Sequence, residues 1–184
     1  GLTLVTIPNS ITKIHEGTFS DCTGLTKVTI PNSVTSIYAL AFENCTGKLI
    51  VKSNHDYYNL KNGSVNGVFY KSKFTTVVIE EGVTVIGQDA FYNCPVTSLT
   101  LPSTLKIIRE RAFRGIKIQS LTIPESVSTI ESEGFSWCNN LRSVVIPSSI
   151  TVIEHTVFYD CTNLKTIYYT GTKEQWNAIQ KGDN

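Results

Sequence analysis

The sequence lacks the features that mark nucleic-acid-binding and membrane proteins. Its 184 residues carry a formal net charge of +1, so no strong electrostatic field is available to attract nucleic acid or an anionic membrane surface. Polar residues interrupt the apolar ones so often that no run approaches the roughly 20 residues of a membrane-spanning helix. The N-terminus shows no signal-peptide pattern. We therefore expect neither nucleic-acid binding nor membrane insertion.

Patterns that carry catalysis or bind metals are also missing. The sequence contains no C-x-x-C pair, no Cys/His metal spacing, no H-E-x-x-H, no G-x-S-x-G and no phosphate-binding glycine-rich loop. The three histidines, His15, His55 and His155, are scattered along the chain. The neighbouring carboxylates Glu80 and Glu81 point apart and indicate a solvated turn. We expect no enzymatic activity, no cofactor and no metal.

What the sequence does contain is one phrase, L-x-x-V-x-I-P-x-S-V-x-x-I-x-x-x-A-F-x-x-C, repeated about every 22 residues. The first branched residue of its β-type half recurs at spacings of 23, 21, 28, 22, 22, 23 and 23 residues. These markers are Val5, Val28, Leu49, Val77, Leu99, Leu121, Val144 and Ile167. Such a period predicts a solenoid of about eight coils that forms a single domain over residues 1–184. Because Gly1 directly precedes a repeat, we also expect the chain to be a piece of a longer protein.

The chemistry of the phrase predicts two walls. The V-x-I alternation indicates a short parallel strand, which Pro ends because it cannot donate a ladder hydrogen bond. Ser or Thr two residues later is expected to bond the local backbone at the corner. The second half, V-x-x-I followed by A-F, predicts a short strand and a helical or 3₁₀ turn whose Phe fills the interior. The predicted fold is an α/β-type solenoid, a right-handed coil with short parallel β-strands on one face and short strands with turns on the other.

The five cysteines occupy one position of the repeat, three residues after its Phe. They are Cys22, Cys45, Cys94, Cys138 and Cys161. In the one complete coil without Cys, this position holds Ile116. A site that accepts Cys or Ile is small, buried and apolar, so we expect free core thiols and neither disulfides nor metal ligands.

Two segments depart from the repeat. Residues 52–73 lack a recognisable A-F-x-x-C and contain the turn signals Asn62-Gly63 and Asn66-Gly67. Within them, Val68-Phe69-Tyr70 predicts a replacement strand, and we expect an irregular coil with a protruding loop or a bend in the axis. Residues 170–184 also depart: Thr172 predicts the N-cap of a helix, and this segment is expected to cap the last coil.

The repeated phrase resembles the BspA-type leucine-rich repeat, found in surface proteins of bacteria and some protozoa. The ending Tyr-Thr-Gly-Thr-Lys-Glu-Gln-Trp-Asn-Ala-Ile is similar to segments that close such arrays. The resemblance implies a leucine-rich-repeat fold and an extracellular or cell-surface module without enzymatic activity. It further implies adhesion to host matrix proteins such as fibronectin and fibrinogen, or to other cells. From the extended surface of the repeat, we expect a protein ligand, with a glycan as the other class of ligand. We expect a monomeric fragment. The alternative is a structural spacer that presents another domain and has no ligand of its own.

Aromatic residues near the repeat Phe suggest where a ligand would bind. The first and second positions after Phe are polar in the early coils, but later coils hold Tyr92, Trp137 and Tyr159 there. Stacking of coils predicts that Tyr92, Arg114, Trp137 and Tyr159 line one edge, and exposed Trp and Tyr favour a contact surface. The competing interpretation is that these rings only pack the turns.

Two other surfaces are candidates. If the sheet is concave, its outward threonine-rich row, together with Lys27, Gln119 and Arg142, is the expected protein-binding surface. One coil is rich in basic residues, which suggests either docking of an acidic partner or an ordinary solvated face. These residues are Lys106, Arg109, Arg111, Arg114 and Lys117.

Overall fold

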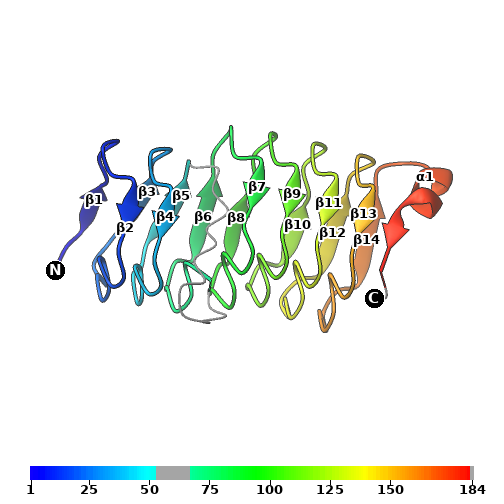
Figure 1. Ribbon diagram of the computed structural model, residues 1–184. Coiled ribbons are helices and arrows are strands. Elements are labelled where there is room, and N and C mark those ends of the chain that lie inside the picture. The colour runs from blue at the N-terminus through cyan, green and yellow to red at the C-terminus, as the bar shows by residue number, and fades with distance from the viewer. Residues whose placement is uncertain (53–66, 183–184) are drawn as a thin grey trace.

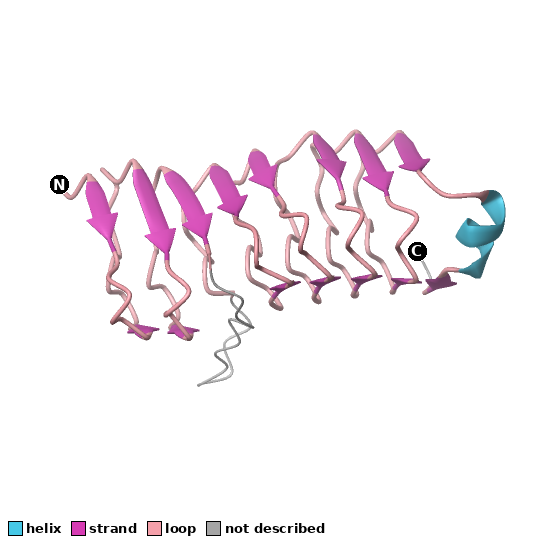
Figure 2. Cartoon of the chain, turned by 90° about the horizontal axis from the view of Figure 1, so that it is seen from above, coloured by secondary structure: helices cyan, strands magenta, loops and turns pink. Residues whose placement is uncertain are grey.

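The computed structural model describes residues 1–52 and 67–182, which form one stack of coils (Figures 1 and 2). His55 and the predicted loop turns fall outside these residues. A row of eight longer strands contains the eight predicted markers, which confirms the solenoid. These strands are β1 (Leu4–Thr6), β3 (Lys27–Ile30), β5 (Lys48–Val51), β6 (Thr76–Ile79), β8 (Ser98–Thr100), β10 (Ser120–Thr122), β12 (Ser143–Ile146) and β14 (Thr166–Tyr169).

A second row of two-residue strands forms the opposite wall, and Figure 2 shows the two rows facing each other. Both rows pair in parallel, so that equivalent residues of successive repeats lie side by side, as Val28, Leu49 and Val77 do. The short strands are β2 (Lys13–Ile14), β4 (Ser36–Ile37), β7 (Val85–Ile86), β9 (Ile107–Ile108), β11 (Thr129–Ile130), β13 (Val152–Ile153) and β15 (Gln180–Lys181).

Along the described residues, the wall of longer strands is interrupted between β8 and β10. The longer strands form the sheets β1-β3-β5-β6-β8 and β10-β12-β14, whereas the short strands form β2-β4 and β15-β13-β11-β9-β7. Opposite the interruption between β8 and β10, the short strands β7, β9 and β11 remain paired, so the stack stays hydrogen-bonded there. The row of longer strands runs without the strong curvature of a horseshoe (Figure 2). The concave sheet on which one predicted binding surface depended is therefore not seen.

A column of stacked phenylalanine rings fills the interior. Neighbouring ring centroids lie 5.0–6.0 Å apart. The described column consists of Phe19, Phe42, Phe69, Phe91, Phe113, Phe135 and Phe158. Parallel stacking of coils brings the same side chain of each repeat together, so the column follows from the repeat.

Phe69 in this column corrects the prediction for the irregular coil. Residues 68–70 form a turn and no strand, and Val68 and Phe69 are both buried. They take the places of Ala and Phe in the phrase, and Ser72 takes the place of Cys, with its Oγ 3.7 Å from Cys94 Sγ. The signature was therefore altered by substitution and not lost, because the column requires a ring in every coil.

The turns around each Phe are not the helical or 3₁₀ turns that the sequence predicted. The residue two after each Phe of the column has a left-handed backbone angle, as has the residue two before each of them except Phe69, and such angles interrupt a helix. Those before it are Gly17, Leu40, Asp89, Arg111, Glu133 and Thr156, and those after it are Asp21, Asn44, Lys71, Asn93, Gly115, Trp137 and Asp160. Eight of their N–H groups donate to the next coil, as Gly115 N–H does to the Ser136 carbonyl at 2.8 Å. The turns thus form a third ladder of hydrogen bonds.

The cysteines lie behind this ladder as free thiols, four of them buried and Cys22 half-buried. Their thiols donate to the Phe carbonyl of the preceding coil, at 2.8 Å for Cys45 and 2.9 Å for Cys94. Cys thus combines a small apolar volume with a weak donor, which Ile116 lacks. Burial raises the pKa of the Cys45 and Cys94 thiols to about 12.

Hydroxyl groups at the corner beyond Pro also bond between coils. Thr104, Ser126 and Ser149 donate to backbone carbonyls of the preceding coil at 2.9, 2.6 and 2.7 Å. The prediction of bonds within the same corner was wrong for these three residues. The stacked coils bring the carbonyls of one corner within reach of the hydroxyls of the next, so each bond joins two coils.

The C-terminal segment contains α1 (Lys173–Ala178), and Thr172 is its N-cap, as predicted. The Thr172 hydroxyl accepts the Gln175 N–H, and the Gln175 side chain accepts the Thr172 N–H. After the helix, β15 pairs with β13 and extends the second wall by another coil. The helix buries none of its residues and leaves Ile167 46% exposed. Trp176 of the helix nevertheless packs against Tyr169, with ring centroids 5.2 Å apart, and Ile179 after the helix is buried in the core, so the segment covers part of the last coil.

Candidate functional site

The structure brings the four predicted edge residues into one row. The Arg114 guanidinium carbon lies 5.6 Å from the Tyr92 ring centroid and 5.8 Å from that of Trp137. The rings of Trp137 and Tyr159 lie 6.2 Å apart, and those of Tyr92 and Tyr70 also 6.2 Å. We call the row of Tyr70, Tyr92, Arg114, Trp137 and Tyr159 the aromatic edge. The predicted alignment is confirmed, and Tyr70, which follows Phe69, was missed because that Phe was assigned to a strand.

Trp137 has a left-handed backbone angle, which is unfavourable for a large side chain. Its φ is +60°, at the position where other coils have Asp, Asn, Gly or Lys. A left-handed angle costs a residue with a Cβ about 1–2 kcal/mol, and bulky residues rarely adopt it. The Trp137 side chain also remains 41% exposed, so burial does not offset this cost in full. Such strain is typical of residues that are held for a function.

Arg114 is fixed between its two aromatic neighbours by an ion pair. Its Nη1 contacts Glu133 Oε2, and the Arg114 side chain is 25% exposed. The ion pair holds the guanidinium group in the row and neutralises much of its charge. The positive charge of Arg114 is consequently committed to the protein itself.

A hollow of about 230 Å³ lies beside the middle of the aromatic edge. Its lining residues are Tyr92, Asn93, Arg114, Gly115, Lys117, Trp137 and Asn139. The Asn139 Oδ1 atom is buried and has no hydrogen-bond partner among the described residues. Lys117 is exposed, and within residues 1–52 and 67–182 no carboxylate forms an ion pair with it. The hollow therefore combines aromatic rings, amides and one uncompensated positive charge.

Most of the predicted basic patch is neutralised from neighbouring coils. Arg111 forms two hydrogen bonds to Asp89, at 2.8 and 3.2 Å, and these bonds are the main cause that raises the pKa of Arg111. The other two arginines of this coil are paired in the same way. The ion pairs between coils are Arg109–Glu131, Arg111–Asp89 and Arg114–Glu133. The coil thus offers an acidic partner far less free charge than its sequence suggests.

The residues predicted on the sheet face do not come together. Lys27 begins β3, next to Leu4 and Lys48 on the neighbouring strands. Arg142 donates its backbone N–H to the Gln119 carbonyl at 2.8 Å, so these two are neighbours. They lie beyond the interruption between β8 and β10, far along the stack from Lys27. The predicted surface is therefore split into two parts.

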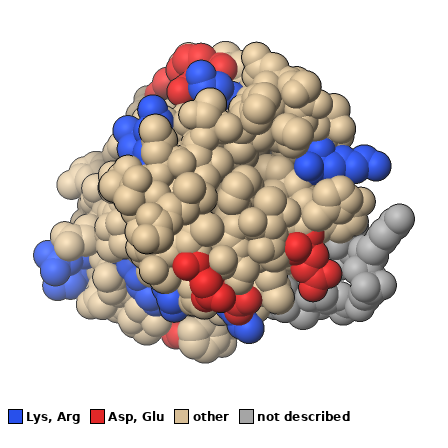
Figure 3. All heavy atoms as spheres, turned by 90° about the vertical axis from the view of Figure 1, so that its left-hand side faces the viewer, with Lys and Arg blue, Asp and Glu red and all other residues tan. Residues whose placement is uncertain are grey.

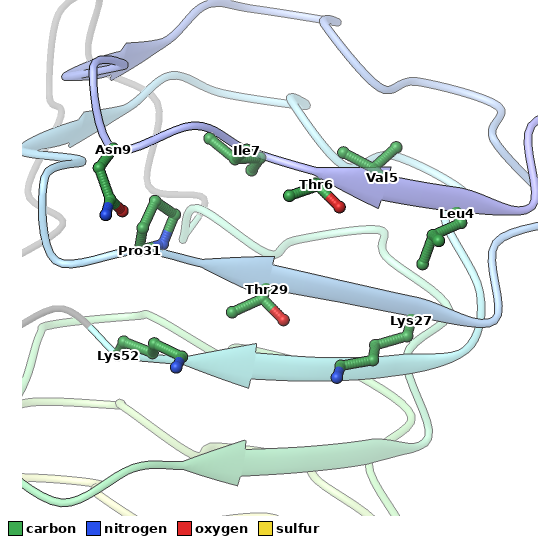
Figure 4. A pocket seen from close by; sticks show the side chains of 9 residues that line it. All are labelled: Leu4, Val5, Thr6, Ile7, Asn9, Lys27, Thr29, Pro31 and Lys52. Atoms are coloured by element: carbon green, nitrogen blue, oxygen red, sulfur yellow. The ribbon is translucent and has the colours of Figure 1, made fainter.

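A second hollow, of about 290 Å³, lies at the N-terminal end of the sheet (Figure 4). Threonines and apolar side chains form most of its lining, and one of its two lysines, Lys52, pairs with Glu80 at 3.2 Å. Seen from this end, acidic and basic groups are interspersed among neutral atoms (Figure 3). Although this hollow is the larger one, its side chains suggest no particular ligand chemistry.

The described part of the chain holds no metal-binding cluster and no membrane-spanning helix. There, no group of three or more His, Cys, Asp or Glu side chains is arranged to hold a metal ion. His15 instead stacks on Tyr38, with ring centroids 5.2 Å apart. The described helix is also far shorter than a bilayer-spanning helix, and no other is described.

Comparison with known proteins places the chain in a family. The sequence profile described as "BspA type Leucine rich repeat region" matches residues 1–63 and 65–179 in six copies. A leucine-rich cell surface protein from Faecalibacterium prausnitzii has a similar structure, with 29% identity over 97% of this chain and a TM-score of 0.61. A leucine-rich repeat protein from Bacteroides ovatus shares the fold, with 24% identity over 94% of the chain and a TM-score of 0.52.

This chain spans 56% and 43% of those two proteins, respectively. No curated protein matches it. The profile covers almost the whole chain. The chain belongs to the BspA-type leucine-rich repeat family.

Proposed function

We propose that the chain is a non-enzymatic binding module of an extracellular or cell-surface protein, which adheres to a host matrix protein or another cell-surface macromolecule. The observation that carries this proposal is the aromatic edge. Trp, Tyr and Arg are the residues that contribute most at binding interfaces. Here they form a continuous row that the fold does not require, because the early coils have Ser, Asp, Glu and Asn at the same positions.

The cost of placing Trp137 in this row supports the same conclusion. A left-handed backbone and a partly exposed indole oppose stability, and aspartate, asparagine or glycine would fit the turn better. Exposed aromatic side chains gain their energy when a partner covers them. The surface location is supported by the Faecalibacterium structure, which is described as a cell surface protein.

The proposal is tested by measuring binding of the whole chain to immobilised fibronectin, fibrinogen and mucin with biolayer interferometry. The test variant is Trp137→Asn, because Asn occupies the same left-handed position at Asn44 and Asn93. The matched control is Tyr168→Thr, which removes a ring that is 59% exposed on the sheet face. We expect affinity to fall at least about tenfold for Trp137→Asn, equivalent to about 1.4 kcal/mol, and to stay unchanged for Tyr168→Thr.

The alternative, a structural spacer, predicts a different outcome. A spacer retains none of these proteins, and Trp137→Asn then changes nothing but stability. The stack of coils suits a spacer as well as a binding module, so only the binding measurement separates the two. Binding that is equally strong in both variants would show that another surface is used.

A further inference from the structure

We infer that the hollow beside the aromatic edge binds an anionic sugar residue, bearing a carboxylate or a sulfate, within a longer glycan chain. The inference rests on the proposed function, because it names the class of partner that the same edge would contact. It goes further by assigning a site and a ligand chemistry to particular residues.

The size of the hollow favours a small rigid group. Its volume of about 230 Å³ is below the roughly 300 Å³ at which pockets for drug-sized ligands begin. A helix or strand of a protein partner needs a longer groove. One ring-shaped group with substituents, such as a single sugar residue, is of a suitable size.

The hydrogen-bonding groups around the hollow suit hydroxyl groups. Asn93 and Asn139 each present an amide, which both donates and accepts, as the vicinal hydroxyls of a sugar require. Asn139 Oδ1 is buried and lacks a partner among the described residues, so it is an acceptor in need of a donor. Because this oxygen is closed off from solvent, a sugar hydroxyl in the hollow would contact the remaining amide atoms of Asn93 and Asn139.

The aromatic rings offer a surface for the apolar side of a sugar. The planes of Trp137 and Tyr159 are inclined at 62°, so the two rings do not cover each other face to face. An aromatic face is electronegative and attracts polarised C–H groups, which line one side of a sugar ring. Trp137 is 41% and Tyr159 57% exposed, which leaves both rings accessible.

The charge of the hollow selects an anion. Arg114 is paired with Glu133, whereas Lys117 has no ion-pair partner in the described part of the chain. The charge that remains available is therefore positive. A carboxylate or sulfate on the sugar would complement Lys117 at close range, and salt would weaken this attraction because the lysine is exposed.

The extent of the aromatic edge points to a chain rather than a free monosaccharide. The edge crosses five successive coils, from Tyr70 to Tyr159. With about 4.8 Å between neighbouring coils, it is roughly 20 Å long. Several linked sugar residues can lie along such a row, with one of them in the hollow.

The test is isothermal titration of the whole chain with three polysaccharide fragments of equal length: heparin, hyaluronan and neutral dextran. Heparin carries sulfate and carboxylate, hyaluronan carries carboxylate only, and dextran carries no charge. The variants are Trp137→Asn and Lys117→Gln. Their controls are Tyr168→Thr and Lys106→Gln, which remove an exposed ring and an exposed amine outside the hollow. Thermal unfolding of every variant verifies that the fold is retained.

The expected result is binding of heparin, hyaluronan or both, no binding of dextran, and a loss of about tenfold or more in both test variants but in neither control. Binding of heparin alone would identify sulfate as the recognised group, and binding of hyaluronan would identify carboxylate. Binding of dextran as strongly as the charged chains overturns the assignment of Lys117.

A second arm separates this inference from the proposed function. If the chain binds enzymatically deglycosylated fibronectin as well as the native protein, and Trp137→Asn abolishes both, the sugar inference is wrong and the proposed function stands. If neither glycans nor proteins bind, both fail.

Discussion

A fully buried phenylalanine inside the ring column, Phe113, gives the sharpest test of the fold. Phe113 is fully buried and stacks between two rings, each 5.3 Å away and inclined by only 4° and 13°. Phe158, near the end of the described column, is half-buried and has one neighbour at 6.0 Å. Replacing each of them by Ala removes the same atoms from two different environments, so the difference measures what the stack contributes.

The magnitude follows from these contacts. Phe→Ala in a core costs about 3–5 kcal/mol, and each stacked aromatic pair adds about 0.5–1.5 kcal/mol beyond burial. With two pairs lost, we expect Phe113→Ala to destabilise the chain by roughly 5 kcal/mol. With one looser pair and partial exposure, Phe158→Ala should cost about half as much. A typical domain has only about 5–15 kcal/mol in total, so the first variant approaches the limit of folding.

Urea unfolding followed by two probes measures this. Far-UV circular dichroism reports on all coils, whereas tryptophan fluorescence reports on the C-terminal part, since the only two tryptophans are Trp137 and Trp176. In a solenoid each coil is stabilised by its neighbours, so Phe113→Ala should separate the two halves and make the two transitions diverge. Equal destabilisation by both variants, or coincident transitions in Phe113→Ala, would refute the role assigned to the stack.

Three further predictions concern the turns, the thiols and a carboxylate. Gly115→Ala places a Cβ 2.2 Å from Asn93 Oδ1 at a φ of +76°. Thermal unfolding should therefore show that the free energy of unfolding falls by about 1–2 kcal/mol or more. Adding Asn93→Ala should restore the part of this loss that is due to the clash. Cys94, whose burial raises its pKa to about 12, should resist Ellman's reagent in the native protein at pH 8, whereas half-buried Cys22 reacts first. Hydrogen bonds from Ser103 in the next coil lower the pKa of Glu81 in the folded protein below its value in the unfolded chain. The Glu81 carboxylate therefore stabilises the fold at any pH above its unfolded-state pKa, and this stabilisation is lost as pH falls through its folded-state pKa. Glu81→Gln should therefore lower the melting temperature at pH 7, and this difference should vanish in acid.

The fold could be predicted in most of its parts because every coil repeats the same solution. The eight markers lie in the eight longer strands, and the Phe and Cys positions lie inside, since stacking in register brings like residues together. The error at residues 68–70 shows the limit of this reasoning. Val and Ser in place of Ala and Cys hid the phrase behind an irregular segment, and only the ring column revealed that Phe69 belongs to it.

The ion pairs could have been found by the same reasoning. Arg109 and Glu131 are 22 residues apart, as are Arg111 and Asp89, which is one period of the repeat. Reading the basic coil alone, without the coils on either side, gave a charged patch where the structure has neutralised arginines. In a solenoid the environment of a surface residue is the residue one period away, and not its neighbour in sequence.

The backbone angles around Phe could not be predicted in this way, and they change how the candidate site is understood. Left-handed residues usually reveal themselves as Gly or Asn, but here the positions also hold Leu40, Arg111 and Thr156. At Arg111 a hydrogen bond between coils holds this conformation, because its N–H donates to the Ser132 carbonyl at 3.0 Å. The sequence thus holds unfavourable residues at several of these positions, and Trp137 carries the same cost of a left-handed angle as they do. The third ladder of hydrogen bonds therefore leaves the side chains along this strip of the solenoid free to differ between coils. The aromatic edge is the part of the strip where these side chains are large and aromatic.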